Sequence, residues 1–288
     1  MRTGVVVALL SASLCAPGGV SSIFVDQAAA SGAAPRRAAG SPSYWAYAGD
    51  PAVRRGAVPG VADPRKSGRH PLGLAPDPGA APLPARMADT GGGTQLITAE
   101  APTTGSTSGT VTWWDLRDGT WTAAGTAPAR FGSNGLVEGT TRTQGTSTTP
   151  TGLYDLPFAF GIAPQPAGTR VPYRPVGENS WWCEDNSSTS YNRWVDPLPA
   201  DCRAAESEHL ITYTGQYAYG LVVGFNYDKP VHGRGAGIFL HVNGKAATAG
   251  CVSVPEDAML RILAWADPAA GPHMAIGTTD GTTAITRY

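Results

Sequence analysis

A cysteine and the histidine ten residues before it are the residues of this sequence best suited to chemistry. An apolar stretch over residues 237–242 contains His241, and a loop of small residues then leads to Gly250 and Cys251. A thiol becomes a strong nucleophile when it ionises, which a neighbouring histidine promotes. Glycine lets the backbone turn tightly, so the amides near Gly250 and Cys251 are candidates for an oxyanion hole. The pattern predicts a thiol nucleophile at Cys251 with His241 as its base.

The loop between the two residues decides whether they meet. Asn243-Gly244 is a strong signal for a two-residue β-hairpin. A strict hairpin would place Cys251 opposite Ala236, roughly 17 Å along the strand from His241 at about 3.4 Å per residue. Catalysis therefore requires the connecting loop to fold back. The alternative is that Cys251 only fills the core as a small hydrophobic residue.

The elements that must position this pair are predicted to be mainly β. Short stretches rich in Thr, Val and Trp, separated by Gly and Ser turns, are typical of strands. We predict strands over residues 94–101, 110–117, 121–125, 153–161, 210–213, 220–227 and 237–242, with a last strand beginning at His273.

The clearest helical pattern follows the cysteine directly, over residues 255–266. Its apolar stripe consists of Met259, Leu260, Ile262 and Leu263. Ser253 and Glu256 form a capping-box pattern at its start. The dipole of a helix capped at Ser253 would direct its positive end towards Cys251 and favour the thiolate.

The N-terminal residues have the composition of an export signal. Arg2 is followed by an apolar stretch over residues 5–16, and residues 28–30 offer small side chains for cleavage. The apolar stretch is too short for a stable membrane span. We predict a signal peptide over residues 1–30 and a secreted or cell-wall protein, with lipidation at Cys15 as a weaker alternative.

The segment after the signal peptide has a different composition. Residues 31–92 contain 34 Pro, Ala and Gly in 62 positions, so they cannot bury enough apolar surface to offset their ordering entropy. We predict a disordered tether there and a folded domain over residues 93–288. A formal net charge of −1 with 15% charged residues argues against nucleic-acid binding. We expect a monomer.

Export makes the cysteine count informative. Cleavage near residue 30 leaves three cysteines, and Cys183 and Cys202, which bracket a polar segment, are the natural disulfide pair. Cys251 is then the free thiol, kept either as a buried hydrophobic residue or for chemistry. The histidines show no zinc-ligand spacing, so we predict no metal site.

Residues 237–253 resemble the catalytic signature of the L,D-transpeptidase (YkuD) family, in which a strand-borne histidine is followed by a loop and a Ser-His-Gly-Cys-type motif. Residues 149–154 look like the family's Thr-Pro-x-Gly strand. The segments 181–183, 191–193 and 208–210 resemble the exported subgroup also labelled ErfK/YbiS/YcfS/YnhG. The resemblance covers essentially residues 95–288 and implies a YkuD-type β-sandwich with one or two short helices.

This resemblance implies a peptidoglycan L,D-transpeptidase that needs no metal or organic cofactor. In the family, the thiolate attacks the carbonyl of the third residue of a tetrapeptide stem and expels the terminal D-Ala. The acyl group then passes to the side-chain amine of a neighbouring stem, which gives a 3→3 cross-link. Carried over, Cys251 is the nucleophile, His241 the general base and the Gly250 backbone an oxyanion donor. Substrate contacts are predicted at Thr248, Ala249, Ser253, Tyr154 and His209.

The sequence departs from the family pattern in the spacing from His241 to Cys251, which is shorter than the common family spacing and requires a tighter connecting loop. It also departs at three positions beside the pair. Ala249 replaces the motif's second histidine, and Ser253 stands where many members carry Arg or Asn. Val242 follows His241 where a Ser often orients the base, although the Val242 carbonyl can still accept the imidazole N–H.

Two other functions stay open on the sequence alone. One is an L,D-carboxypeptidase or endopeptidase that uses water as acceptor, and the other is a non-catalytic cell-wall-binding protein. Trp181, Trp182 and Tyr191 are candidates for stacking on glycan sugars, although aromatic residues in β domains belong more often to the core.

Overall fold

The computed structural model describes residues 81–288. The predicted signal peptide (1–30) and most of the predicted tether (31–92) therefore lie outside the described residues. The described part is mainly β, as predicted, with one α-helix and several short 3-10 helices. None of the helices in this part is long and apolar enough to cross a membrane.

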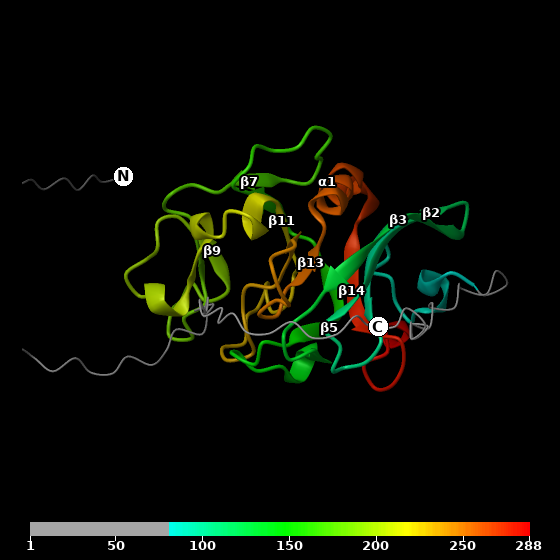
Figure 1. The fold of residues 1–288 in the computed structure, drawn as a ribbon, viewed down its shortest axis with the longest axis horizontal. Helices are drawn as coiled ribbons and strands as arrows, with labels where there is room; N and C mark the ends of the chain where they lie inside the picture. Colours follow the sequence, from blue (N-terminus) through cyan, green and yellow to red (C-terminus); the bar gives the residue numbers. More distant parts are fainter. Residues whose placement is uncertain (1–80) are drawn as a thin grey trace, which may run out of the picture. The chain divides into compact units, whose positions relative to one another are not determined.

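Most strands belong to one eleven-stranded sheet (Figure 1). They are β1 (Gln95–Ala101), β2 (Ser108–Arg117), β3 (Thr120–Arg130), β4 (Leu136–Glu138), β5 (Thr149–Asp155), β6 (Ala159–Gly161), β7 (Tyr173–Pro175), β11 (Gly220–Val222), β12 (Phe239–Val242), β13 (Val252–Val254) and β14 (His273–Thr278). Their order across the sheet is β4-β5-β14-β1-β2-β3-β13-β12-β11-β6-β7. A separate three-stranded sheet consists of β8 (Trp181–Cys183), β9 (Arg193–Val195) and β10 (Glu208–His209), in the order β10-β8-β9.

The helical elements are short. The α-helix is α1 (Glu256–Trp265), and the 3-10 helices are η1 (Leu83–Arg86), η2 (Gly139–Thr141), η3 (Ala204–Glu206), η4 (Leu210–Thr212), η5 (Gln216–Ala218), η6 (Pro268–Ala270) and η7 (Ile285–Arg287). The strand predicted over residues 210–213 is wrong, because η4 occupies this stretch. The Thr212 hydroxyl donates to the His209 carbonyl at 2.7 Å, a local bond that favours a turn over an extended chain.

The start of α1 differs from the predicted capping box. Pro255 is the N-cap and no side chain caps the helix. Ser253 lies inside β13, where its hydroxyl donates to Asn243 Oδ1 at 2.8 Å. A strand therefore separates Cys251 from α1, and the predicted activation of the thiol by the helix dipole is wrong. The Val-Ser-Val run pairs with β12 and β3, and this tertiary pairing overrides the local helix signal.

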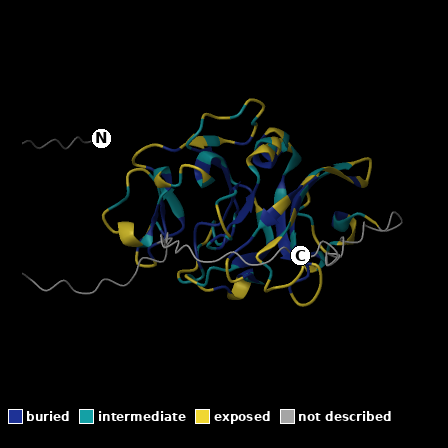
Figure 2. Cartoon of the chain, in the orientation of Figure 1, coloured by how far each residue is buried: buried dark blue, intermediate teal, exposed yellow. Residues whose placement is uncertain are grey.

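The strands β12 and β13 lie between two apolar clusters, and Figure 2 shows the buried centre of the fold. One cluster contains Leu240 and Val252 together with the apolar face of α1. The other contains Phe239 and Cys251, packed with buried aromatic residues such as Trp182. Because side chains alternate along a strand, this second cluster defines the side of the sheet on which the candidate site lies.

The predicted disulfide between Cys183 and Cys202 is present. It joins the end of β8 to the segment before η3. Two residues after Cys183, the carboxylate of Asp185 accepts hydrogen bonds from the Arg203 guanidinium at 2.6 and 2.8 Å. These bonds hold the pKa of Asp185 well below its usual range. The small sheet is thus cross-linked at one end by a covalent bond and an ion pair.

The aromatic residues proposed for glycan stacking lie mostly inside the protein. Trp182 and Tyr191 are buried, and their polar atoms donate to Asn192 Oδ1 at 2.9 Å and Gln144 Oε1 at 2.7 Å. Trp181 stacks on His209 with ring centroids 4.2 Å apart. The structure therefore assigns Trp182 and Tyr191 to the core.

The described part of the predicted tether contacts the end of the chain. Ala88 N donates to the Thr286 carbonyl at 3.0 Å, and Asp89 N donates to the Tyr288 carbonyl at 2.8 Å. Leu83 and Met87 pack against a small apolar cluster that contains Ile285. The folded part thus starts before the predicted boundary at residue 93.

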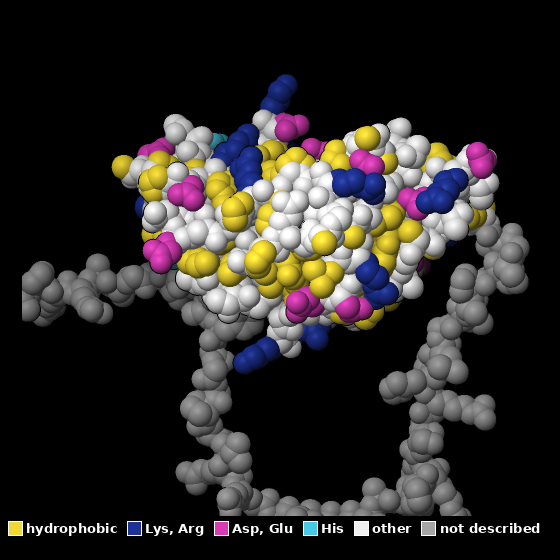
Figure 3. Space-filling model, turned by 90° about the horizontal axis from the view of Figure 1, so that it is seen from above, with side chains coloured by type: hydrophobic (Ala, Val, Ile, Leu, Met, Phe, Trp, Pro, Cys, Tyr) yellow, Lys and Arg dark blue, Asp and Glu magenta, His cyan; other side chains and the backbone are white. Residues whose placement is uncertain are grey.

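Charged side chains on the face drawn in Figure 3 are mixed in sign. Lysine and arginine side chains lie among aspartate and glutamate side chains, and neither sign gathers into one extended patch on this face. That distribution provides no continuous basic track for a nucleic-acid backbone on this face.

Replacing both Cys183 and Cys202 by alanine should lower the free energy of unfolding by about 3 kcal/mol, because the crosslink restricts a loop of about 20 residues in the unfolded chain. Urea unfolding monitored by tryptophan fluorescence measures this change. Dithiothreitol should destabilise the wild-type protein by a similar amount and leave the double variant unaffected. Equal stability of the double variant and the oxidised wild type would contradict the expectation.

Candidate active site

The parallel pairing of β12 and β13 brings Cys251 close to His241. His241 is the register partner of Ser253, and Cys251 lies two residues before Ser253. The two side chains thus share one face of the sheet, with a separation between their Cα atoms of roughly 8 Å from ordinary strand spacing. The hairpin favoured by Asn243-Gly244 does not form. The loop folds back, as catalysis requires, and returns the chain in the same direction as β12.

Hydrogen bonds with the end of β3 and with the residue after it fix the loop of residues 243–250. Arg130 Nη1 donates to the Gly244 carbonyl at 2.7 Å and to the Ala246 carbonyl at 3.3 Å. Thr248 N donates to the Phe131 carbonyl at 2.8 Å. Backbone groups that a hairpin would have paired with β12 are therefore satisfied by a neighbouring strand instead.

The thiol of Cys251 is almost completely buried, with 7% of the residue exposed. Phe239 N donates to the sulfur at 3.4 Å, and the thiol donates to the Gly237 carbonyl at 3.3 Å. The Cys251 carbonyl accepts bonds from the hydroxyls of Thr248 at 2.6 Å and Thr149 at 3.2 Å. The backbone at the cysteine is thus fixed from two sides.

Gly250 is required by the turn into Cys251. Its φ is +146°, which side-chain-bearing residues rarely adopt, and a Cβ there would lie 2.9 Å from Arg142 Nη2 and 3.0 Å from the Thr148 carbonyl. Its amide donates to Thr248 Oγ1 at 3.1 Å. The amide expected to be open as an oxyanion donor is therefore already engaged within the loop.

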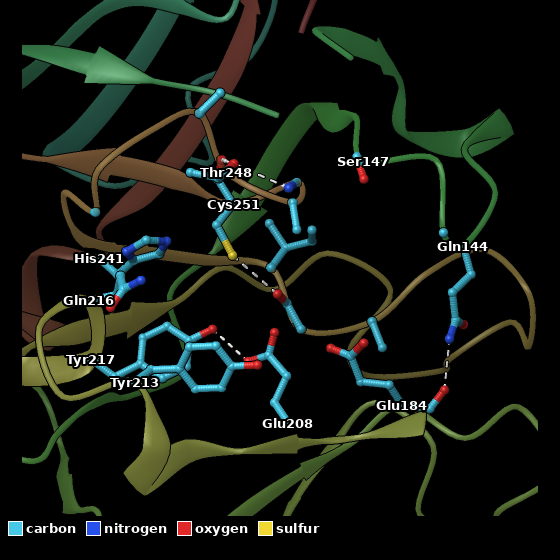
Figure 4. A pocket seen from close by; sticks show the side chains of 18 of the residues that line it. Gln144, Ser147, Glu184, Glu208, Tyr213, Gln216, Tyr217, His241, Thr248 and Cys251 are labelled. Atoms are coloured by element: carbon cyan, nitrogen blue, oxygen red, sulfur yellow. Dashed lines mark hydrogen bonds between the residues drawn. The ribbon is translucent and has the colours of Figure 1, made fainter. Parts of the chain in front are cut away.

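The imidazole of His241 has a defined tautomer. Nδ1 lies 2.7 Å from the Val242 carbonyl, and since a carbonyl only accepts, Nδ1 carries the proton. Nε2 is then the basic nitrogen. The ring packs edge-on against Tyr217 with centroids 5.5 Å apart. Figure 4 shows the imidazole and the sulfur of Cys251 facing the same pocket.

Burial sets the charge state of the pair. It raises the pKa of the Cys251 thiol well above its usual range, and the nearby buried Glu208 raises it further. Burial lowers the pKa of His241 to about 4, although the bond to Val242 opposes this shift. At neutral pH the pair is therefore a neutral thiol and a neutral imidazole. The thiol proton has to move to Nε2 as the sulfur attacks.

A pocket lies in front of the sulfur and contains about 850 Å³ of empty space, counting the solvent at its open mouth. Its walls come from the loop before Cys251, from η5, from the segment before β5 and from the small sheet. The lining residues include Arg142, Gln144, Ser147, Glu184, Glu208, Tyr213, Gln216, Tyr217, Gly237, His241, Thr248, Ala249, Gly250 and Cys251.

Two carboxyl groups in this wall are deeply buried. Glu208 Oε2 accepts a hydrogen bond from the Tyr217 hydroxyl at 2.5 Å, and burial raises the pKa of Glu208 to about 7. Burial also raises the pKa of Glu184 well above its usual value. The charge of Glu208 adds to this shift, and Arg142 opposes it.

The structure brings together only some of the residues predicted to contact substrate. Thr248 and Ala249 line the pocket with the predicted pair and Gly250, but Ser253, Tyr154 and His209 do not. Ser253 is fully buried because β13 turns it towards Asn243. Its burial and its bond to Asn243 do not support the predicted substrate contact of Ser253, which stays a prediction.

Tyr154 and His209 have structural partners of their own. The Tyr154 hydroxyl donates to the Thr151 carbonyl at 2.6 Å, and its ring packs on Phe225. The stacking of His209 on Trp181 leaves its Nε2 bound to the Glu178 carbonyl at 2.6 Å. Neither side chain lines the pocket, and the two substrate contacts stay predictions that this pocket does not support.

Sequence reasoning did not select the pocket residues Arg142, Glu184 and Tyr217. One signal was present, because the apolar strand Trp181-Trp182-Cys183 is followed directly by two acidic residues, Glu184 and Asp185. An acidic residue in such a position is either at a surface or in a functional pocket. The sequence alone does not distinguish these two cases.

Among the described residues, no group of three or more His, Cys, Asp or Glu side chains is arranged to hold a metal ion. A thiol beside an imidazole in a pocket is the arrangement of enzymes that work through a covalent cysteine intermediate.

Residues 105–283 match the YkuD family, described as the L,D-transpeptidase catalytic domain. This match spans more than half of the chain, so the chain belongs to that family, whose members are cysteine-dependent L,D-transpeptidases acting on peptidoglycan peptides. The predicted family is confirmed, and its exported subgroup stays a prediction.

No curated protein matches the sequence. One solved structure to which the chain is similar is that of Bdellovibrio bacteriovorus Bd1075, with 13% sequence identity and a TM-score of 0.32. The match covers 64% of this chain and 48% of that chain, so it spans about half the length of the solved protein. A TM-score this low carries no argument about the present fold.

Alkylation of Cys251 by iodoacetamide should become about tenfold faster per pH unit from pH 7 to 9, without reaching a plateau, because burial keeps the thiol protonated over this range. Mass spectrometry of the intact protein measures the rate. The urea-unfolded protein is the control, and its rate should level off near the ordinary thiol pKa of about 8.5. A plateau already near pH 6 in the folded protein would show a preformed thiolate–imidazolium pair.

Proposed function

We propose that this protein forms 3→3 cross-links between peptidoglycan stems through an acyl-Cys251 intermediate. The observation that carries the proposal is the pocket in which Cys251 and the Nε2 side of His241 share one face of the β12–β13 pair. Membership of the YkuD family supports the substrate class. The shifted pKa values of Cys251 and His241 support a mechanism that starts from a neutral thiol and a neutral imidazole.

The acylation step begins from the neutral thiol. Nε2 of His241 takes the thiol proton while the sulfur attacks the carbonyl carbon of the third stem residue, so a C–S bond forms. The C–N bond to D-Ala then breaks, and the imidazolium returns the proton to the leaving amine. The products are a thioester on Cys251, free D-Ala and a neutral imidazole.

The transfer step reverses these roles. The side-chain amine of a neighbouring stem attacks the thioester carbon, which forms a new C–N bond as the C–S bond breaks. The amine gives up one proton to His241 Nε2, and this proton returns to the departing sulfur of Cys251. The enzyme regains its starting state, and no cofactor takes part.

The loop before the cysteine would position these steps. Thr248 bonds both the Gly250 amide and the Cys251 carbonyl, so it fixes the backbone on either side of the attacking sulfur. In our proposal the amides of Gly250 and Cys251 hold the oxyanion, and the Gly250 amide exchanges the Thr248 hydroxyl for the substrate oxygen. Ala249, which lies between Thr248 and Gly250 in the chain, also lines the pocket.

The location follows from the substrate. Peptidoglycan lies outside the cytoplasmic membrane, so the proposal includes export by the predicted signal peptide over residues 1–30. The expected monomer is compatible with it, since every residue named in the two steps belongs to one chain.

Cys251→Ala should abolish both D-Ala release and dimer formation from disaccharide-tetrapeptides, because the variant lacks the atom that carries the acyl group. Chromatography with mass detection measures both products. The wild-type protein should also gain the mass of the acyl group, or of a carbapenem added in its place, at Cys251. Dimers formed by the alanine variant would refute the mechanism. Trimmed monomers without dimers from the wild type would show a carboxypeptidase, and sacculus binding without any adduct would show a binding protein.

Thr248→Val should lower the acylation rate by about ten- to a hundredfold, because the hydrogen bond from its hydroxyl to the Cys251 carbonyl positions the backbone at the nucleophile. Thr248→Ser keeps the hydroxyl and should stay within about threefold of the wild type. Single-turnover acylation followed by intact mass gives both rates. Equal rates for the valine and serine variants would remove Thr248 from the positioning role.

A further inference from the structure

The wall of the pocket opposite the loop carries two buried carboxyl groups. Glu184 follows β8, and Glu208 lies in β10 as the register partner of Trp182. Each of the two glutamates is only 4% exposed. Both line the pocket that contains Cys251, and Figure 4 shows their side chains on its wall. The mechanism above uses neither of them.

These carboxyls are poorly compensated by the protein. Within the described residues neither forms an ion pair, and Glu184 Oε1 is buried with no hydrogen-bond partner. Arg142, a cation in the segment before β5 that also lines the pocket, directs Nε to the Thr148 carbonyl at 2.8 Å and Nη1 to the Arg234 carbonyl at 3.2 Å. A buried carboxyl oxygen without a partner is costly, so its retention in a pocket indicates a group that arrives with the ligand.

Gly237 connects this wall to the nucleophile. Its carbonyl accepts the hydrogen bond of the Cys251 thiol. A Cβ at position 237 would lie 2.0 Å from Glu184 Oε1, so only a glycine leaves room for this carboxyl group. The φ of +63° also favours glycine here. The unpartnered oxygen is therefore separated from the thiol by a single backbone residue.

We propose that Glu184 and Glu208 form a subsite for the primary ammonium group of a diamino-acid side chain in the stem peptide. This proposal rests on the proposed function and names the chemical feature by which the pocket selects its substrate. An ammonium brings one positive charge and three donors in a compact group, which suits an unpartnered oxygen beside a second carboxyl. A metal ion fits less well, because the described residues offer no third ligand of the required type.

The ammonium has two sources in this reaction. It belongs either to the third residue of the donor stem, whose carbonyl is attacked, or to the acceptor stem, whose amine attacks the thioester. In the first case the subsite acts during acylation. In the second case it acts only during transfer, where the carboxyls hold the amine beside the acyl group until it loses its proton.

Binding tests the subsite without any turnover. In a Cys251→Ala background, calorimetry compares a tetrapeptide bearing a free side-chain amine on its third residue with the same peptide acetylated at that amine. The free amine should bind at least about tenfold more tightly. Glu184→Gln and Glu208→Gln, each added to this background, should reduce the preference to about twofold or less. Glu206→Gln changes a partly exposed carboxylate two residues before Glu208 that does not line the pocket; it is the matched control and should preserve the preference.

Two results would overturn the subsite. One is equal binding of the free and acetylated peptides by the Cys251→Ala protein, and the other is a preference that survives both glutamine substitutions. Thermal melting excludes a merely structural role. The glutamine variants should melt at or above the parent temperature, because each replaces a buried carboxyl group, whose ionised form burial disfavours, by a neutral amide of similar shape. A clear loss of stability together with an unchanged preference would assign the glutamates to the fold.

Kinetics on the protein with an intact Cys251 distinguishes the two sources. A slower gain of the acyl mass in the glutamine variants would assign the ammonium to the donor stem, and normal acylation followed by slower dimer formation would assign it to the acceptor. A wild-type protein that never gains an acyl mass would refute the proposed function. The binding experiment would still test the ammonium subsite, because it needs no acylation.

Discussion

The parallel pairing of β12 with β13 is the constraint on which the rest of the site depends. A parallel neighbour requires a connection that reverses the chain twice, and here the loop of residues 243–250 does so within a few residues. Arg130 at the end of β3 and Phe131 directly after it bind backbone groups of this loop, so the loop does not form the hairpin that its own sequence favours. The same pairing gives Cys251 and His241 a common face.

The burial produced by this packing determines how the pair is activated. A thiol enclosed between Phe239 and the Gly237 carbonyl is stable as a neutral group, and the imidazole is neutral for the same reason. The thiol is therefore activated only when substrate binds. The sulfur then attacks the carbonyl carbon while His241 Nε2 takes the thiol proton. A thiol held protonated in this way is also less reactive towards oxidants.

The small sheet supplies the opposite wall of the pocket, and its own constraints fix that wall. The disulfide involves Cys183, the residue directly before Glu184, and the ion pair to Arg203 involves Asp185, the residue directly after it. Glu184 is thus held between a covalent crosslink and a salt bridge. These neighbours restrict the backbone enough to keep a carboxyl group in a place that it would otherwise leave for water.

The sequence by itself determined the features that depend on local pattern. The family, the mainly β class, the free Cys251, the Cys183–Cys202 pair and the strand-borne His241 all follow from residue type and spacing. Tertiary structure decided everything that depends on pairing between distant segments. It made Ser253 a buried strand residue instead of a helix cap, because β12 and β3 offered it partners. It also brought Glu184 and Glu208 to the thiol, since contacts between residues far apart in the chain leave no periodic signal in the sequence.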